Sequence, residues 1–316
     1  MVTTHGMTRR TFIVRAAAAG LALPSLSMLL AACGEDGAGD TVSPFNGSYN
    51  IDDADTGTLV EVSVADGVRT IKSNGLPNHP TGAFPNAGNP NTISAQTYSF
   101  TLPASPIRSA TAAAYNVPQP FGIAVNGVKI DPFAAEWYDN DATSGWQLAA
   151  LANPLGFDGN NAHVQPNGAY HYHGVAPALI TAQNKPLLIG WAGDGFPIYG
   201  PYGYQDPSDP GSPVVELHSS YRLKTGERRS GPGGVFDGTY IEDYEYVADS
   251  GDLDECNGRV GITPEHPEGI YHYVATTEWP SYGRCFAGEI ADSFRVEPPA
   301  GVGPRDAGRG PGPRTP

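Results

Sequence analysis

The sequence predicts a mainly β protein: a single β-rich domain, sandwich- or barrel-like, with many Gly/Pro loops and one or two short helices. Forty glycines and thirty prolines occur among the 316 residues, and both residue types disfavour helices and favour turns. They are spread along the whole chain, between short runs of β-branched and aromatic residues that are typical of strands. Sixteen tyrosines can supply large buried faces for such a fold.

Two hairpins have the clearest local signals. Residues 58–73 alternate apolar and polar side chains on both sides of Asp66-Gly67. Residues 121–130 do so around Asn126-Gly127. Asp-Gly and Asn-Gly favour the tight turns that connect antiparallel strands, because both central positions tolerate a positive φ.

The remaining elements follow from capping and composition. Residues 144–152 are the best candidate for a helix, because Ser144 is a favourable N-cap and Asn153-Pro154 ends the segment. Residues 74–91 are crowded with Pro, Gly and Asn and are expected to form an ordered loop. Further strands are expected at residues 169–173, 187–191, 198–199, 221–224, 240–247 and 270–275.

One phrase occurs twice. Residues 166–172 read Pro-Asn-Gly-Ala-Tyr-His-Tyr, and residues 267–273 read Pro-Glu-Gly-Ile-Tyr-His-Tyr. The echo of Phe-Asp-Gly at residues 157–159 and at residues 236–238 precedes each copy. Duplication would produce a pseudo-symmetric pair of strands, whereas convergence on a common turn-into-strand motif would leave the same letters.

The first copy continues to His173, which gives Tyr-His-Tyr-His. Successive side chains of a strand point to opposite faces, so His171 and His173 share one face and the two tyrosines share the other. Two imidazoles at i and i+2 can converge on one ion. The spacing therefore predicts a metal site.

Further histidines are expected to complete this site. His163 precedes a Gln-Pro-Asn-Gly turn that can fold it back toward the strand. His272 occupies in the second copy the position that His171 has in the first, so pseudo-symmetry would bring the two strands together. The predicted ligands are thus His171, His173, His163 and His272, with His79 ranked after them.

Zinc or copper fits a set of neutral imidazoles, and the ligand types alone do not choose between them. The alternative is a packed aromatic ladder in which the histidines are hydrogen-bonded and hold no ion.

Asp194 is the candidate catalytic carboxylate. It lies between Gly193 and Gly195, which let the backbone approach closely, so its side chain can serve as a general base or orient a histidine. The alternative is a turn aspartate that accepts hydrogen bonds from its own backbone.

The N-terminus is typical of an export signal. Arg9-Arg10 belongs to a twin-arginine pattern, and the apolar run that follows ends at Leu30-Ala31-Ala32-Cys33-Gly34, which looks like a bacterial lipobox. Cleavage before Cys33 and lipidation of its sulfur would anchor the protein to the extracytoplasmic side of a bacterial membrane. The alternative, a transmembrane helix, is disfavoured by the short length and by Pro24.

Four segments result: a signal peptide at residues 1–32, a flexible tether at 33–44, the β-rich domain at 45–296 and a disordered Gly/Pro/Arg-rich tail at 297–316. The formal net charge is −15. Because such a field repels nucleic acid and no basic stretch offsets it, nucleic-acid binding is excluded as a main function.

Two cysteines remain once Cys33 carries lipid. Cys256 and Cys285 form an even pair in an oxidising compartment, which predicts a disulfide around the second copy of the phrase. A redox or metal-binding pair of thiolates is the alternative, but there is no Cys-x-x-Cys spacing.

The chain also resembles a known family. Residues 160–174 (Asn-Asn-Ala-His-Val-Gln-Pro-Asn-Gly-Ala-Tyr-His-Tyr-His-Gly) are similar to the hallmark of the bacterial YHYH family, and the blocks at residues 73–79, 190–200 and 251–259 match it as well. The resemblance covers most of the chain between Asn46 and Phe294. It implies an exported bacterial protein and no particular activity, because the family is largely uncharacterised.

Three functions are therefore compared. The first is a metal-dependent enzyme, with a hydrolase favoured over a redox enzyme because a bound ion lowers the pKa of water. The second is a non-catalytic extracytoplasmic module that binds metal, a small molecule or a glycan. The third is a structural domain with buried His/Tyr hydrogen bonds. An enzyme needs its histidines at the floor of a cavity, whereas a structural domain needs no cavity.

Overall fold

The computed structural model describes residues 44–296. In that range the chain forms eighteen strands and six single turns of 3-10 helix, which confirms the mainly β fold. No helix in this range is long and apolar enough to cross a membrane. The predicted signal peptide, Cys33, the tail and all of the tether except Pro44 lie outside the described residues, and the domain boundaries stay predictions.

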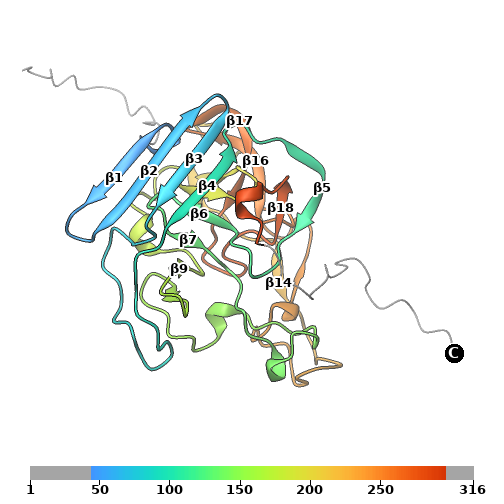
Figure 1. Cartoon of the computed structure of the whole chain (residues 1–316). Helices are drawn as coiled ribbons and strands as arrows, with labels where there is room; N and C mark the ends of the chain where they lie inside the picture. Colours follow the sequence, from blue (N-terminus) through green and yellow to red (C-terminus); the bar gives the residue numbers. More distant parts are fainter. Residues whose placement is uncertain (1–43, 297–316) are drawn as a thin grey trace, which may run out of the picture. The chain divides into compact units, whose positions relative to one another are not determined.

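A four-stranded antiparallel sheet comes first in the chain, drawn in blue to green in Figure 1. Its central hairpin is the one predicted around Asp66-Gly67, where φ is 52° at Asp66 and 76° at Gly67. Alternation holds, with Val60 and Val62 buried and Glu61 between them exposed. The strands are β1 (Tyr49–Asp53), β2 (Thr58–Ala65), β3 (Val68–Ser73) and β4 (Tyr98–Pro103).

An eight-stranded sheet forms the centre of the domain, in the order β16-β17-β11-β10-β6-β7-β9-β8. The hairpin predicted around Asn126-Gly127 is confirmed as β6–β7, with φ 77° at Gly127. The strands are β6 (Gly122–Ala124), β7 (Lys129–Ile130), β8 (Ala162–Val164), β9 (Tyr170–Tyr172), β10 (Leu188–Ala192), β11 (Pro197–Tyr199), β16 (Gly258–Thr263) and β17 (His266–Val274).

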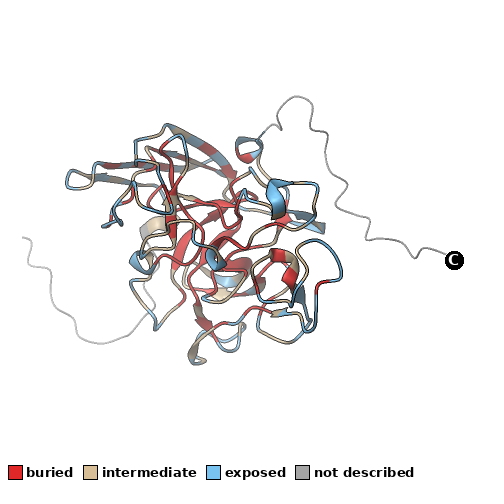
Figure 2. Ribbon diagram, turned by 90° about the horizontal axis from the view of Figure 1, so that it is seen from below, coloured by how far each residue is buried: buried red, intermediate tan, exposed pale blue. Residues whose placement is uncertain are grey.

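The two sheets pack together as in a sandwich, and the described residues form no closed barrel. Ile71 and Leu102 of the first sheet share a buried cluster with Ile123 and Trp191 of the second. A larger cluster holds Phe121, Tyr273 and Phe286. Figure 2 shows that the buried residues are concentrated in the centre of the domain, with exposed loops around them.

The eight-stranded sheet consists of two halves of four strands each, and the two halves have the same strand order when each is followed from the centre of the sheet to its edge. Strands β6, β7, β9 and β8 make one half, and β10, β11, β17 and β16 make the other. In each half the first two strands are antiparallel, the next pair is parallel and the last pair is antiparallel. The halves meet at β6 and β10, where Ile123 pairs with Trp191, its own counterpart. The sheet therefore has an internal two-fold pseudo-symmetry.

The backbone details of the two halves agree. Asn161 has φ 53° and Asn257 has φ 59°. The carbonyl of each asparagine accepts a hydrogen bond from the residue that follows its Tyr-His-Tyr, namely His173 and Val274. Four tyrosine contacts repeat as well: Tyr170 with Asp158 and Tyr271 with Asp254, then Tyr172 with Asn126 and Tyr273 with Asp194. These repeats favour duplication over convergence.

Two expectations about the repeat are wrong. The copies do not lie together, because β9 and β17 are separated by β7, β6, β10 and β11. At about 4.8 Å per strand this puts them on the order of 20 Å apart. The counterpart of Asp158 is Asp254 and not Asp237, which instead pairs with Arg228. The pseudo-symmetry axis lies between β6 and β10, so duplication carries the two copies to opposite ends of the sheet.

The helix expected at residues 144–152 is also wrong. The backbone N–H of Leu148 donates to Glu136 O and that of Ala149 donates to Thr239 O. Only Ala150–Ala152 forms a 3-10 turn. Hydrogen bonds to two neighbouring segments hold this stretch extended, which local capping signals do not reveal.

The remaining elements form short ribbons and turns at the periphery of the sheets. Residues 240–247 contribute only a three-residue strand, because their first half is a 3-10 turn. The strands are β5 (Arg108–Ala114), β12 (Tyr202–Tyr204), β13 (Val214–Glu216), β14 (Tyr221–Leu223), β15 (Tyr244–Tyr246) and β18 (Cys285–Gly288). The 3-10 turns are Pro44–Asn46, Tyr138–Asn140, Ala150–Ala152, Pro177–Leu179, Ile241–Asp243 and Asp292–Phe294.

Candidate metal centre

The turn between β8 and β9 brings the first two histidines together. The backbone N–H of Gln165 donates to Ala169 O and that of Gly168, with φ 85°, donates to Gln165 O. In the resulting ladder His163 lies directly opposite His171, and cross-strand partners share one face of a sheet. The expectation that this turn folds His163 back toward the strand is confirmed.

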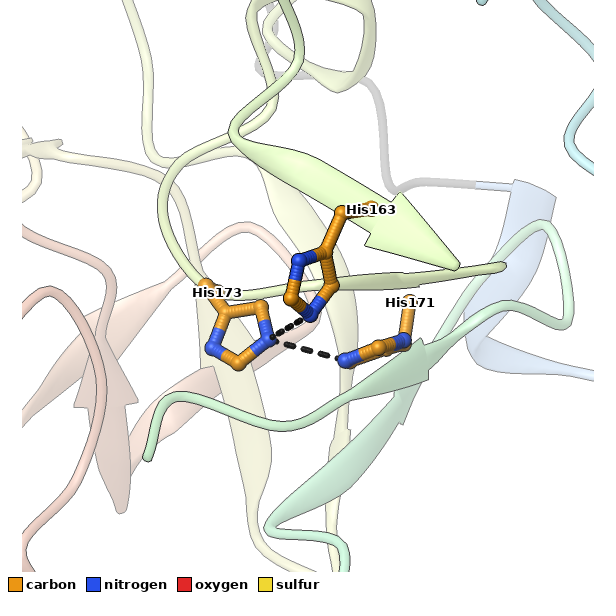
Figure 3. A group of neighbouring side chains, drawn as sticks. All are labelled: His163, His171 and His173. Carbon is orange, nitrogen blue, oxygen red and sulfur yellow. Dashed lines mark hydrogen bonds between the residues drawn. The ribbon is translucent and has the colours of Figure 1, made fainter. Parts of the chain in front are cut away.

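His173, just after β9, completes a group of three. Its Nε2 lies 2.8 Å from Nε2 of His171 and 3.1 Å from Nε2 of His163 (Figure 3). All three ligand atoms lie within 4.8 Å of one another. Three nitrogens around a tetrahedral zinc at 2.0–2.1 Å would be separated by about 3.3 Å. Small movements therefore suffice to bind one ion.

The other ring nitrogens show how the imidazoles are oriented. Nδ1 of His163 lies 2.8 Å from Leu155 O, and Nδ1 of His171 lies 3.2 Å from Ala169 O. A proton on each Nδ1 donates to its carbonyl and leaves the Nε2 lone pair directed at the group, as in metal sites whose histidines are held by backbone carbonyls.

His173 supplies the test of whether an ion fits. Its buried Nδ1 makes no hydrogen bond of good geometry within the described residues, although the backbone carbonyl of Pro132 lies near enough to act on the pKa of the ring in the upward direction. In the absence of an ion, His173 must keep its proton on Nε2 to face two acceptors. A bound cation would let that proton move to Nδ1, next to the carbonyl. The donor set therefore fits a metal better than a proton.

All three imidazoles are neutral near pH 7. Burial lowers the pKa of His171 to about 3, with the neighbouring His163 as the second cause. Burial likewise holds the pKa of His173 well below its ordinary value and lowers that of His163. Because only neutral imidazole binds metal, the group is ready to coordinate without losing protons.

A cavity of about 270 Å³ opens onto the three histidines. Its walls combine the apolar side chains of Val117, Phe133 and Leu155 with the carboxylates of Asp131 and Glu136. His163 is the only one of the three that is not fully buried. The histidines thus lie where a small molecule can reach an ion that they hold.

The opposite face of β9 is structural. Tyr172 Oη is 2.6 Å from Nε2 of His79 and accepts a hydrogen bond from the Asn126 amide at 2.9 Å. Tyr170 donates to Asp158 at 2.7 Å. The alternation predicted for Tyr-His-Tyr-His therefore holds, and it places His79 on the face away from the three histidines.

His272 does not join the group. In the second half the position opposite it, equivalent to His163, is Arg259, and the position equivalent to His173 is Val274. Nδ1 of His272 lies 3.1 Å from Ile270 O and its ring contacts Tyr199. The second copy therefore keeps the strand and one histidine, but it lacks the other two ligands.

His272 is expected to make the fold sensitive to acid. Burial and, as the second cause, the nearby Arg259 guanidinium lower its pKa to about 3. Because the pKa is depressed in the folded state, this stability is complete above about pH 6.5 and is lost as the pH falls toward 3. The free energy of unfolding of the parent should fall between pH 7 and pH 4, and we expect His272→Asn to make this fall smaller by about 3 kcal/mol. Urea unfolding of the metal-free protein at both pH values measures this, and parallel curves for parent and variant would contradict it.

Asp194 also lies outside the group. It is buried, and its carboxylate accepts hydrogen bonds from Tyr273 Oη at 2.6 Å, from the Gly288 N–H at 2.9 Å and from the Phe196 N–H at 3.3 Å. Its counterpart in the first half is Asn126, which contacts the equivalent tyrosine with the direction reversed, because its amide donates to Tyr172 Oη. The three hydrogen bonds that the Asp194 carboxylate accepts, two of them from backbone N–H groups, favour the turn aspartate over the general base.

Asp131 lines the same cavity as the histidines, and no sequence pattern indicated it. Asp131 follows β7 and its N–H donates to Tyr172 O. No spacing relative to the histidines signals it, because parallel pairing of β7 with β9 creates the proximity. The pattern Asp-x-x-Asn occurs at residues 158–161 and again at residues 254–257. With this pattern included, the repeat covers the whole β8–β9 and β16–β17 hairpins and not only their second strands.

The predicted disulfide joins Cys256 and Cys285. It ties the end of the segment before β16 to β18. Its position in the second half separates it from the three histidines along the sheet.

The comparisons with known proteins agree with this description. A family model described as YHYH protein matches residues 99–288, a range that includes the three histidines, Asp131 and the two cysteines of the disulfide. Neither the curated proteins nor the solved structures contain a match. With most of its length covered by the family model and both Tyr-His-Tyr strands in place, the chain belongs to the YHYH protein family.

Proposed function

We propose that this protein binds one divalent transition metal ion, zinc or copper, through the Nε2 atoms of His163, His171 and His173. The observation that supports it most strongly is the convergence of three Nε2 atoms within 4.8 Å, at the floor of a cavity and with their pKa values lowered by burial. Like-facing lone pairs repel one another unless a cation or a proton lies between them.

A metal-dependent hydrolase is the activity that this arrangement supports best. Three neutral imidazoles leave a fourth position of a tetrahedral ion open, as in catalytic zinc sites. When bound, such an ion lowers the pKa of a coordinated water to about 7. The cavity would hold the substrate against Phe133 and Leu155, and the buried histidines keep bulk water from the ligands on the closed side.

The proposed place of action is the outer side of a bacterial membrane. The twin-arginine pattern and Cys33 support export and a lipid anchor. A disulfide between Cys256 and Cys285 suits an oxidising compartment. The membrane is then the first partner of the protein, and a small molecule or glycan is its ligand.

The test is the metal content of the full-length protein, purified without a histidine tag, followed by hydrolysis of p-nitrophenyl acetate. The proposal expects about one equivalent of zinc or copper and hydrolysis that a chelator abolishes and added zinc restores. One equivalent of metal without hydrolysis would favour a binding module over an enzyme. A protein that takes up no metal when soaked would leave a structural domain with buried His/Tyr hydrogen bonds.

A further inference from the structure

Asp131 is a buried carboxylate that forms no ion pair within residues 44–296. It is 5 % exposed. Its Oδ1 accepts a hydrogen bond from Tyr115 Oη at 3.1 Å, and its Oδ2 accepts one from the Gln165 amide at 3.2 Å. Among the described residues no Lys, Arg or His nitrogen forms an ion pair with it. Two neutral donors do not offset the cost of burying a negative charge.

The surroundings of Asp131 confirm this deficit. Burial raises its pKa to about 6, while Lys129 acts on it from beyond ion-pair distance and lowers it. The nearby hydroxyl groups of Tyr98 and Tyr115 are neutral, because burial raises the pKa of both tyrosines, so they do not compensate the charge of the carboxylate. The carboxylate would therefore be stabilised by a cation in the cavity that it lines together with the three histidines.

Its place in the sheet puts Asp131 beside His173. Ile130 pairs with Tyr172 in the parallel ladder of β7 and β9, so the next residue on each strand is Asp131 and His173. Its oxygens are nevertheless absent from the group of ligand atoms within 4.8 Å of one another. Asp131 thus borders the site without belonging to the three ligands.

The second half of the sheet serves as an internal comparison. Because Ile198 is the counterpart of Ile130, Tyr199 is the counterpart of Asp131. Tyr199 is neutral, its hydroxyl donates to the Glu265 carboxylate at 2.6 Å, and Thr263 Oγ1 lies 2.8 Å from the same hydroxyl. The half in which two ligands are replaced by Arg259 and Val274 thus also lacks the carboxylate. Asp131 thus occurs only in the half that has the complete set of histidines.

We propose that Asp131 is a positioning residue of the metal centre, which acts on the bound ion and on its water from beside the three histidines without coordinating the ion itself. It accepts a hydrogen bond from a water or hydroxyl group in the cavity and offsets the charge of the ion, so it positions the group that would react. The inference rests on the proposed metal site and assigns its orienting role to Asp131 in place of Asp194.

The experiment compares Asp131→Asn with the full-length parent at pH 8, where the carboxylate is ionised. Removal of an outer-shell partner weakens metal binding by roughly 10–100-fold, so we expect zinc affinity, measured by competition with a chromophoric chelator, to fall about tenfold. The melting temperature of the metal-free variant should be no lower than that of the parent, since an uncompensated buried charge is gone. A lower melting temperature with unchanged zinc affinity would show a purely structural role and overturn the inference.

Two further variants keep the result unambiguous. Glu136→Gln removes an exposed carboxylate that lines the same cavity, and we expect it to change zinc affinity less than twofold. If Glu136→Gln lowered zinc affinity as much as Asp131→Asn, Asp131 would act only through its charge at a distance, and the inference would be wrong. Should Asp131→Asn fail to fold, Tyr115→Phe removes one donor and keeps the carboxylate. It should lower the metal-free melting temperature and leave zinc affinity at least as high, and weaker zinc binding would contradict the inference.

The parent distinguishes this inference from the proposed function. A parent that binds no zinc refutes the metal site itself. A parent that binds zinc as tightly as Asp131→Asn refutes only the role of Asp131.

Discussion

The double substitution His171→Ala/His173→Ala is expected to abolish metal binding and leave the fold intact. Two of the three ligands would be lost, and a complete structural zinc site contributes about 10–16 kcal/mol. Even one quarter of that value corresponds to a loss of affinity of about a hundredfold or more. Elemental analysis of the purified proteins should find about one equivalent of metal in the parent and none in the variant.

Thermal unfolding with and without zinc measures the same effect independently. A ligand present at a thousand times its Kd stabilises the folded state by about 4 kcal/mol. The parent should therefore melt at a higher temperature when zinc is added, and the double variant should not respond. The proposal would be wrong if the variant gained as much stability from zinc as the parent.

Two single substitutions make matched controls. His163→Arg copies the second half, where Arg259 lies opposite His272 without disturbing the strand pair. We expect this variant to fold and to bind no metal. His218→Ala removes an exposed histidine whose Nδ1 lies 3.3 Å from Glu278. The His218→Ala variant should retain all of the metal. A lower metal content in this variant would point to nonspecific binding at the surface.

The second large effect is expected from the disulfide. Cys256 and Cys285 are 29 residues apart in the sequence, and the loop that they close contains the β16–β17 hairpin. By the chain-entropy model, opening a loop of this length costs roughly 3–4 kcal/mol. In a domain of about 250 residues this lowers Tm by roughly 10 °C.

Urea unfolding of Cys256→Ser/Cys285→Ser against the oxidised parent tests this value. Reductant should destabilise the parent to the level of the variant and should leave the variant unchanged. Because the bond lies in the half without the complete histidine group, zinc affinity of the folded protein should be the same with and without it. A change in the free energy of unfolding below 1 kcal/mol would mean that the loop is already constrained in the unfolded chain.

Local sequence signals were sufficient wherever neighbouring residues set the conformation. Asp66-Gly67 and Asn126-Gly127 predicted two hairpins because the glycine of each pair adopts the positive φ that a tight turn needs, 76° at Gly67 and 77° at Gly127. Strand alternation predicted that His171 and His173 share a face, and the turn at residues 165–168 predicted the return of His163. The three histidines lie within eleven residues of one another in the sequence, so a single hairpin is enough to bring them together.

Tertiary contacts decided the rest. Residues 144–152 have a helix cap, yet hydrogen bonds from Leu148 and Ala149 to distant segments hold them extended. The free energy of those contacts exceeds the few tenths of a kcal/mol per residue by which propensity favours a helix. A prediction based on capping alone has no access to them.

The repeat shows the same limit on a larger scale. By itself the sequence predicted that two Tyr-His-Tyr strands exist, that one of them presents two histidines on one face, and that Cys256 pairs with Cys285. Only the tertiary structure decided that the copies lie near opposite ends of one sheet, that His272 faces Arg259, that Asp194 accepts a hydrogen bond from Tyr273, and that Asp131 lines the same cavity as the three histidines. Turn chemistry and alternation act over a few residues, whereas the order of strands in a sheet depends on which distant surfaces bury each other, and no short motif records that choice.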